Sequence, residues 1–193
     1  MEEVGVAEHR DELLEGLKGR VVEIGCGNGL NFVHYPEGVE SVLAVEPEPH
    51  LRRLAERAAA DAPVEVTVVD GIAEDLPAVD DSFDGAVASL VLCSVGDQGA
   101  ALAEARRVLR PGGELRFYEH VAGDGPLVAR IERFMDATFW PRVAGGCHSH
   151  RDTVGAIRAA DFEVEAVRSF EFPRERMPLS AHVMGRARSA TTP

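Results

Sequence analysis

Three glycines alternate directly after an apolar stretch, at Gly25, Gly27 and Gly29. Glycine permits positive φ and lets a ligand approach the backbone closely. Because Val21 and Val22 precede the glycines, the pattern predicts a buried strand that ends in a ligand-binding loop. The spacing is G-x-G-x-G, whereas the dinucleotide fingerprint places its third glycine one residue later. A tight strand-to-helix turn without a ligand is the alternative.

A carboxylate follows the next apolar stretch, Ser41 to Val45. This residue is Glu46, and Pro47 after it cannot donate a hydrogen bond to a strand ladder, so the strand is expected to end there. Glu46 stands beyond the glycine loop by roughly the 20-residue spacing at which an acidic residue meets a ribose. Loop and carboxylate together predict a cofactor that contains a ribose. The alternative is that Glu46 is an exposed loop residue.

Strands and helices alternate along the chain, which predicts an α/β fold with an open, mostly parallel sheet and helices on both faces. The apolar positions of the helix that begins at Pro49 leave Arg52 on its outward face. Leu127 to Thr138 predicts a helix that either packs on the sheet or forms a wall of the substrate pocket. The strands are expected at 21–24, 41–45, 64–69, 83–90, 114–121, 162–170 and 181–187, and the other helices at 8–17, 30–35, 101–109 and 153–160.

The 193 residues fit one domain, 1–193, with a disordered tail at about 189–193. No apolar run is long enough to cross a bilayer, and the acidic start Met1-Glu2-Glu3 lacks the features of a secretory signal, which favours the cytoplasm. The net charge of −13 disfavours nucleic acids and anionic lipid surfaces as partners. We expect a small-molecule substrate, and the sequence does not indicate an oligomeric state.

Cys147, His148 and His150 stand close together near the end of the chain. Their residue types suit a metal, but no carboxylate completes a recognisable ligand spacing. The three cysteines of the chain are widely spaced and form no C-x-x-C pair. We therefore expect no metal site.

Four motifs occur in the order that is typical of one enzyme class: Glu23 to Gly29, Asp70 to Pro77, Asp81 to Asp84, and Leu109 to Gly113. The chain resembles the class I S-adenosylmethionine-dependent methyltransferases with a type 11 methyltransferase domain. The resemblance implies a Rossmann-like, seven-stranded sheet with an antiparallel last strand, and S-adenosylmethionine as cofactor with S-adenosylhomocysteine as its product.

The same resemblance implies which residues contact the cofactor. These are Glu23, Gly25, Cys26, Gly27, Asn28, Gly29, Asn31, Glu46, Pro47, Gly71, Ile72, Ala73, Glu74, Ser89, Leu90 and Val91. Ile72 stands where many relatives carry an acidic residue for the adenine amino group. The backbone at Ile72 and Ala73 must serve that purpose here.

Further stretches resemble the microsomal alkyl-thiol S-methyltransferases more closely. They are Leu90 to Val95, Glu119-His120-Val121, Gly146-Cys147, and Asn31-Phe32 followed by Tyr35-Pro36. The resemblance implies a small apolar acceptor with a thiol. That family carries an N-terminal membrane anchor, which we do not expect here because the chain begins almost directly at the catalytic domain. The alternatives are methylation of oxygen, nitrogen or carbon, as in quinone methyltransferases, and a non-catalytic cofactor-binding domain.

His120 is the best candidate for a catalytic base, since it is expected at the mouth of the strand Glu114 to Val121. Histidine side chains ordinarily titrate near pH 6.5 and can take the proton of a thiol as it becomes a thiolate. A purely structural histidine, bonded to a backbone carbonyl or to Glu119, is the alternative.

Overall fold

The computed structural model describes residues 6–121, 130, 138, 146, 148, 151–172 and 180–190. The expected helix at 127–138 and most of the loop at 145–150 lie outside the described residues. The helices are α1 (Val6–Leu14), α2 (Pro49–Ala58), α3 (Gln98–Val108) and α6 (Thr153–Ala159), with short 3-10 helices η1 (Phe32–His34) and η2 (Ala59–Asp61). The strands are β1 (Gly19–Ile24), β2 (Val39–Val45), β3 (Glu65–Val69), β4 (Phe83–Ser89), β5 (Leu109–His120), β6 (Phe162–Phe172) and β7 (Ser180–Ser189).

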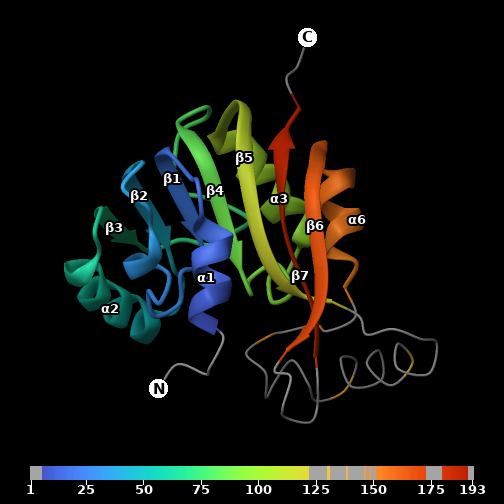
Figure 1. Cartoon of the computed structure of the whole chain (residues 1–193), viewed down its shortest axis with the longest axis horizontal. Helices are drawn as coiled ribbons and strands as arrows, with labels where there is room; N and C mark the ends of the chain where they lie inside the picture. The colour runs from blue at the N-terminus through green and yellow to red at the C-terminus, as the bar shows by residue number, and fades with distance from the viewer. Residues whose placement is uncertain are drawn as a thin grey trace.

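The strands form one seven-stranded sheet in the order β3-β2-β1-β4-β5-β7-β6. Neighbours from β3 to β5 are parallel, while β7 is antiparallel to both β5 and β6. The mostly parallel sheet with a reversed last strand is therefore confirmed. After β1 the chain builds outward to β3 and then returns to β4 on the other side of β1, so strand order reverses between β1 and β4 (Figure 1). Ligands of open α/β sheets bind beyond the carboxyl ends of the strands at such a reversal.

Apolar side chains fill both faces of the sheet. Val22 and Ile24 of β1 point to the core that includes α3 and Ile157 of α6, while Val21 points to the core beneath α1 and α2. Figure 1 shows α1 in front of the sheet and α3 and α6 behind it. Because β1 is buried on both faces, it holds the loop that follows it on a rigid support.

Several elements depart from the expected boundaries, and the helix expected at 30–35 is the shorter 3-10 helix η1. Helix α1 ends at Leu14, because Gly16 adopts a φ of 77° before β1 begins. Strand β5 begins at Leu109, which pairs with Phe83 before the register shifts around the Pro-Gly-Gly turn. Strand β7 continues to Ser189, which pairs with Phe162 and is buried. Ser189, the first residue of the expected tail, therefore belongs to β7, and residues 191–193 lie outside the described residues.

Within the described part of the chain, no helix has the length and apolarity needed to cross a membrane.

Candidate cofactor and acceptor site

The glycine loop after β1 lies at the reversal of strand order. Gly25, Gly27 and Gly29 all have positive φ, at 64°, 59° and 80°. A Cβ on Gly25 would lie 2.4 Å from Cγ2 of Val91, so the loop after β4 packs directly against this glycine. A Cβ on Gly27 would meet nothing within 4 Å. The backbone at Gly27 therefore borders open space that a ligand can enter.

Glu46 connects the glycine loop to the end of β2. Its Oε2 accepts the backbone N–H of Gly27 at 2.8 Å, and its Oε1 accepts the N–H of Glu48 at 2.9 Å. The side chain is only 5% exposed, so it is not the exposed loop residue of the alternative interpretation. Each carboxylate oxygen can accept a second hydrogen bond. Glu46 thus has the acceptor capacity that a pair of ribose hydroxyls requires.

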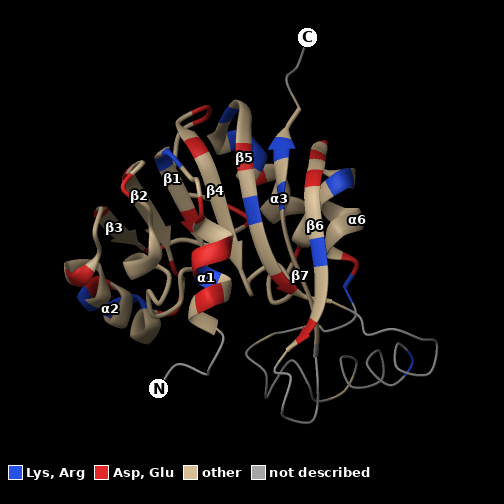
Figure 2. Cartoon of the chain, viewed as in Figure 1, with Lys and Arg blue, Asp and Glu red and all other residues tan. Residues whose placement is uncertain are grey.

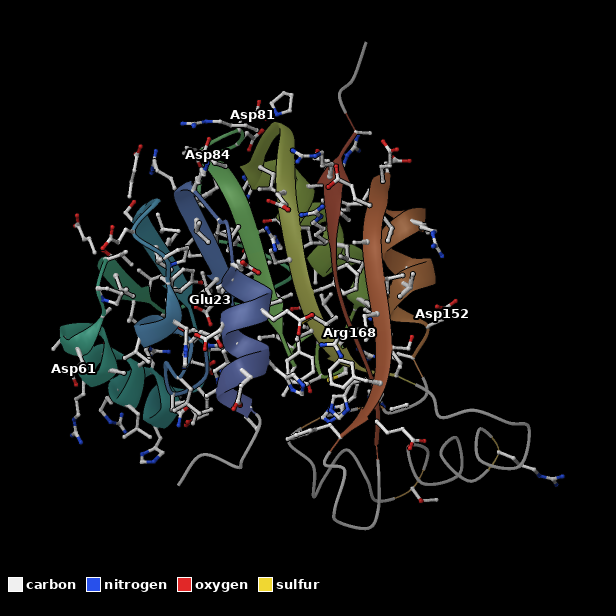
Figure 3. All side chains as sticks on the ribbon, in the orientation of Figure 1. Glu23, Asp61, Asp81, Asp84, Asp152 and Arg168 are labelled. Atoms are coloured by element: carbon white, nitrogen blue, oxygen red, sulfur yellow. The ribbon has the colours of Figure 1, made fainter. Side chains whose placement is uncertain are left out.

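Glu23 and Asn31 lie buried beneath the glycine loop, and their contact with the cofactor stays a prediction. The Glu23 carboxylate accepts Asn31 Nδ2 and the Tyr35 hydroxyl, each at 2.8 Å, and Asn31 Oδ1 accepts Arg10 from α1 at 2.6 Å. Glu23 and Asn31 are 1% and 2% exposed. Figure 3 shows Glu23 beside α1. Burial raises the pKa of Glu23 to about 7, although the bonds from Tyr35 and Asn31 oppose the shift.

Arg52 connects two strand ends of the site, which its sequence pattern did not indicate. We expected it on the outward face of α2, but its Nη1 donates to the carbonyl of Glu46 at 2.8 Å and to a carboxylate oxygen of Asp70 at 2.8 Å. It also reaches the carbonyl of Pro47 at 3.1 Å. Arg52 therefore joins the ends of β2 and β3, the two strands that carry the expected ribose and adenine contacts. The spacing of six residues from Glu46 on the following helix is the only signal that the sequence offered.

Glu119 is the second residue whose function the sequence did not reveal. It is fully buried at the end of β5, and its carboxylate accepts the backbone N–H groups of Val91, Leu92 and Cys93 at 3.1, 2.9 and 3.0 Å. Burial raises the pKa of Glu119 well above its ordinary range, and these three bonds partly oppose the shift. The loop that follows β4 is therefore attached to the end of β5.

Three separate stretches of the sequence meet at Cys93. His120 Nδ1 lies 3.8 Å from the Cys93 sulfur, and the backbone N–H of His148 donates to the Cys93 carbonyl at 2.8 Å. Gly146 has a φ of 89°, and a Cβ on it would lie 3.2 Å from the Ser94 carbonyl oxygen. Three of the four stretches that carried the resemblance to thiol methyltransferases are thus neighbours in space. Cys147 and His150 lie outside the described residues, and the absence of a metal stays a prediction.

Rings extend from His120 across the carboxyl end of β5, the amino end of the antiparallel β7 and the carboxyl end of β6. The His120 ring lies 4.3 Å from that of His182 on β7, and His182 stacks near Phe170 of β6 at 5.7 Å. Phe170 in turn lies 4.7 Å from the ring of His9 on α1. Aromatic contacts of this kind fix ring orientation as well as burying apolar area. The ring of His120 is therefore held on one side by β7 and faces Cys93.

The expected cofactor residues divide into two groups. Cys26, Gly29 and Ala73 are buried, as are Glu23 and Asn31, so they shape the loops from within. Ile72 and Leu90, at 49% and 36% exposed, are large apolar side chains open to solvent at the ends of β3 and β4. The remaining accessible members are Gly25, Gly27, Asn28, Pro47, Gly71, Glu74, Ser89 and Val91. A hydrogen-bonding carboxylate with open glycine backbone and exposed apolar side chains suits a nucleoside with a charged tail.

Comparisons with known proteins agree with this geometry. A family model described as "Methyltransferase domain" matches residues 22–117. The chain is 36% identical to thiol S-methyltransferase TMT1B from Mus musculus over 90% of this chain and 73% of that protein. A SAM-dependent methyltransferase structure from Thermotoga maritima covers 95% of this chain and 89% of its own, at 27% identity and a TM-score of 0.69. One from Methanosarcina mazei covers all of both chains at 20% identity, with a TM-score of 0.72, and supports the fold.

Fold and site together define an S-adenosylmethionine-dependent methyltransferase. Its cofactor is S-adenosylmethionine, and the alternative of a non-catalytic cofactor-binding domain is not favoured. The chain belongs to the methyltransferase family that includes the thiol S-methyltransferase TMT1B.

Proposed function

We propose that this chain transfers the methyl group of S-adenosylmethionine to the sulfur of a small, apolar thiol. The observation that carries the proposal is the meeting of Cys93, His120 and His148 at the carboxyl ends of β4 and β5. Thiol S-methylation by the relative TMT1B supports the same acceptor class. The net charge of −13 opposes a polyanionic acceptor.

In this proposal the glycine loop and the strand ends hold the cofactor. Gly27 and Asn28 border the methionyl part, Glu46 accepts the ribose hydroxyls, and Ile72 and Leu90 enclose the adenine. Ser89 and Val91 line the side nearest the acceptor. When bound, the cofactor supplies a methyl group on a sulfonium that a nucleophile displaces directly. The protein then contributes alignment of the two reactants and exclusion of water.

His120 is the proposed base. Its Nδ1 lies 3.8 Å from the Cys93 sulfur, and the ring of His182 packs beside it. The acceptor S–H gives its proton to the imidazole, the thiolate displaces the methyl group from the sulfonium and forms the new S–C bond, and the proton passes to solvent as the thioether leaves. The net products are a methyl thioether, S-adenosylhomocysteine and one proton. Histidine is suited to this exchange because it changes charge near neutral pH.

A comparison of acceptors with different acidities tests both the thiol acceptor and the assignment of His120 as the base. Full-length protein is incubated with labelled S-adenosylmethionine and thiols, phenols, amines or quinols, and the products are identified by mass. We expect methylated thiols. In His120→Ala, weakly acidic alkyl thiols should lose about 100-fold in rate at pH 7, within the range of general base catalysis, while thiophenols that are already ionised should lose far less.

Two results would count against these assignments. Methylation of only a phenol, an amine or a quinol carbon would exclude the thiol acceptor. Equal losses for alkyl thiols and thiophenols in His120→Ala, or no loss for either, would remove His120 as the base while leaving the acceptor class intact. Cofactor binding by the variant, measured with S-adenosylhomocysteine, serves as the control for correct folding.

A further inference from the structure

The loop that follows β4 has its backbone hydrogen bonds satisfied by other parts of the protein. The N–H groups of Val91, Leu92 and Cys93 all point to the Glu119 carboxylate. The Leu92 carbonyl accepts Arg151 at 2.8 Å and Gln98 at 3.3 Å. The Val91 carbonyl accepts the N–H of Ser94 at 2.8 Å. Buried backbone groups are nearly always paired, but it is unusual for one side chain to pair three successive N–H groups.

Only an acidic side chain of this length fits the arrangement. Three donors require three acceptor positions, and an ionised carboxylate offers about four on two oxygens. Glutamine offers a single oxygen and would direct its own N–H groups at the backbone donors. Successive N–H groups that converge in this way form a binding site for an anion, and here the anion is supplied by the protein itself. Bonds of this kind to an ionised carboxylate are stronger than bonds between neutral groups, and here they oppose the rise that burial causes in the pKa of Glu119.

The residues held in this way form one wall of the cofactor site. Leu90, directly before them, has a φ of 57°, a left-handed conformation that is strained for a non-glycine residue. Val91 directly faces Gly25, so close that any Cβ on Gly25 would overlap it. Hence a small displacement of residues 91–93 would move Val91 relative to the glycine loop.

We propose that Glu119 is a positioning residue for the cofactor: through the N–H groups of residues 91–93 it fixes Val91 against the glycine loop and thereby sets the affinity for S-adenosylmethionine and S-adenosylhomocysteine. Glu119 acts through the loop and does not itself touch the reacting atoms. This function depends on the cofactor and is independent of the thiol acceptor and of His120.

Calorimetric titration of the full-length protein with S-adenosylhomocysteine tests the proposal. We expect Glu119→Gln to weaken binding about tenfold or more, because the loop would no longer be preorganised for the cofactor. Glu119→Asp keeps the carboxylate but is one methylene shorter, so its affinity for S-adenosylhomocysteine should lie between those of the wild type and Glu119→Gln. The control is Glu114→Gln on the same strand. It removes the ion pair with Arg116 at 2.9 Å and some stability, and it should leave the affinity unchanged.

Urea unfolding of each variant separates loss of stability from loss of affinity. A folded Glu119→Gln variant that binds S-adenosylhomocysteine as tightly as the wild type would overturn the proposal. If this variant does not fold, Val91→Ala decides, because it removes the side chain that Glu119 holds in place. We expect weaker binding by Val91→Ala with little change in stability. Wild-type affinity in that variant would also overturn the proposal.

Discussion

Glu23, Glu46 and Glu119 are all buried, but the donors around them differ. Glu46 receives N–H groups from two loops at the edge of the sheet, and it retains acceptor capacity for a ligand. Glu119 receives three N–H groups of one loop and is wholly enclosed. Glu23 receives only side-chain donors, Asn31 and Tyr35, beneath the glycine loop. Residue type alone therefore does not decide which carboxylate meets a ligand.

Replacement of Glu46 should weaken cofactor binding while the protein still folds. In Glu46→Ala we expect S-adenosylhomocysteine to bind more weakly by about 1–3 kcal/mol, the range for loss of charge-assisted hydrogen bonds. Calorimetry measures the affinity. Glu48→Ala is the matched control, since Glu48 caps the N-terminus of α2 through the N–H groups of His50 and Leu51 and has no other assigned function. Unchanged affinity in a folded Glu46→Ala variant would show that Glu46 only stabilises the loops after β1 and β2.

The sequence predicted Glu46 because its position follows from spacing along the chain. The acidic residue at the end of the second strand of a nucleotide-binding unit stands a nearly constant distance after the glycine loop. Glu119 could not be predicted in this way. Its donors come from residues 91–93, nearly 30 positions earlier, and they converge on it only when β4 and β5 pair in register. Arg52 was missed for a similar reason, because periodicity assigned it to solvent.

At the scale of elements, the glycine loop and the loop after β4 form a single contact. Gly25 faces Val91, whereas Gly27 faces open space. Both residues have positive φ, so any other residue would be strained at either position. At Gly25 a side chain would also overlap Val91. The loop therefore combines a glycine required for packing with a glycine required for access.

Alanine at these two positions should give different results. Gly27→Ala should cost about 1–2 kcal/mol of stability from backbone strain, and its methyl group should obstruct the cofactor. Gly25→Ala has the same strain and also overlaps Val91, so its loss of stability should be larger. Urea unfolding and titration with S-adenosylhomocysteine measure the two effects. The interpretation fails if the two variants lose equal stability, or if Gly27→Ala binds the cofactor normally.

Most elements were predictable because their apolar residues repeat with the period of a strand or a helix. Helix α2 begins at Pro49 as expected, and β2, β4 and α6 differ by two residues or fewer at either end. The pairing of β7 between β5 and β6 is a tertiary feature that periodicity does not contain. The resemblance to methyltransferases implied the reversed strand, and the register of β7 with β5 and β6 confirms it.

At the scale of the molecule, α1 connects the two ends of the site. Arg10 reaches Asn31 behind the glycine loop, and Glu12 pairs with Arg168 of β6 at 2.6 Å (Figure 3). In the view of Figure 2, acidic and basic residues are interspersed over the helices and strands. Ion pairs at the surface contribute little individually, so the buried side chains of Leu13 and Leu14 contribute most of the attachment of α1 to the sheet.

The buried carboxyl group of Glu23 makes the stability of the whole protein depend on pH. Its pKa is about 7 in the folded protein, against an ordinary value of 4.5. Between these values the folded state holds a proton that the unfolded state has released, so stability falls as pH rises from about 4.5 to 7 and then levels off. At 1.36 kcal/mol per unit, the 2.5-unit shift corresponds to a loss of about 3 kcal/mol.

Glu23→Gln should remove the contribution of Glu23 to the pH dependence of stability, because glutamine does not titrate. The free energy of unfolding in urea, measured from pH 4.5 to 8, should fall less steeply in Glu23→Gln than in the wild type, and the gap between the two curves should change by about 3 kcal/mol across the window. The variant also loses some stability because its hydrogen bonds to Asn31 and Tyr35 are altered. That loss is the same at every pH, so it does not affect the change of the gap with pH. Glu40→Gln, at an exposed position of β2, controls for loss of one negative charge and should parallel the wild type. Parallel curves for Glu23→Gln and the wild type would mean that Glu23 is ionised throughout, with its charge stabilised by Asn31, Tyr35 and Arg10.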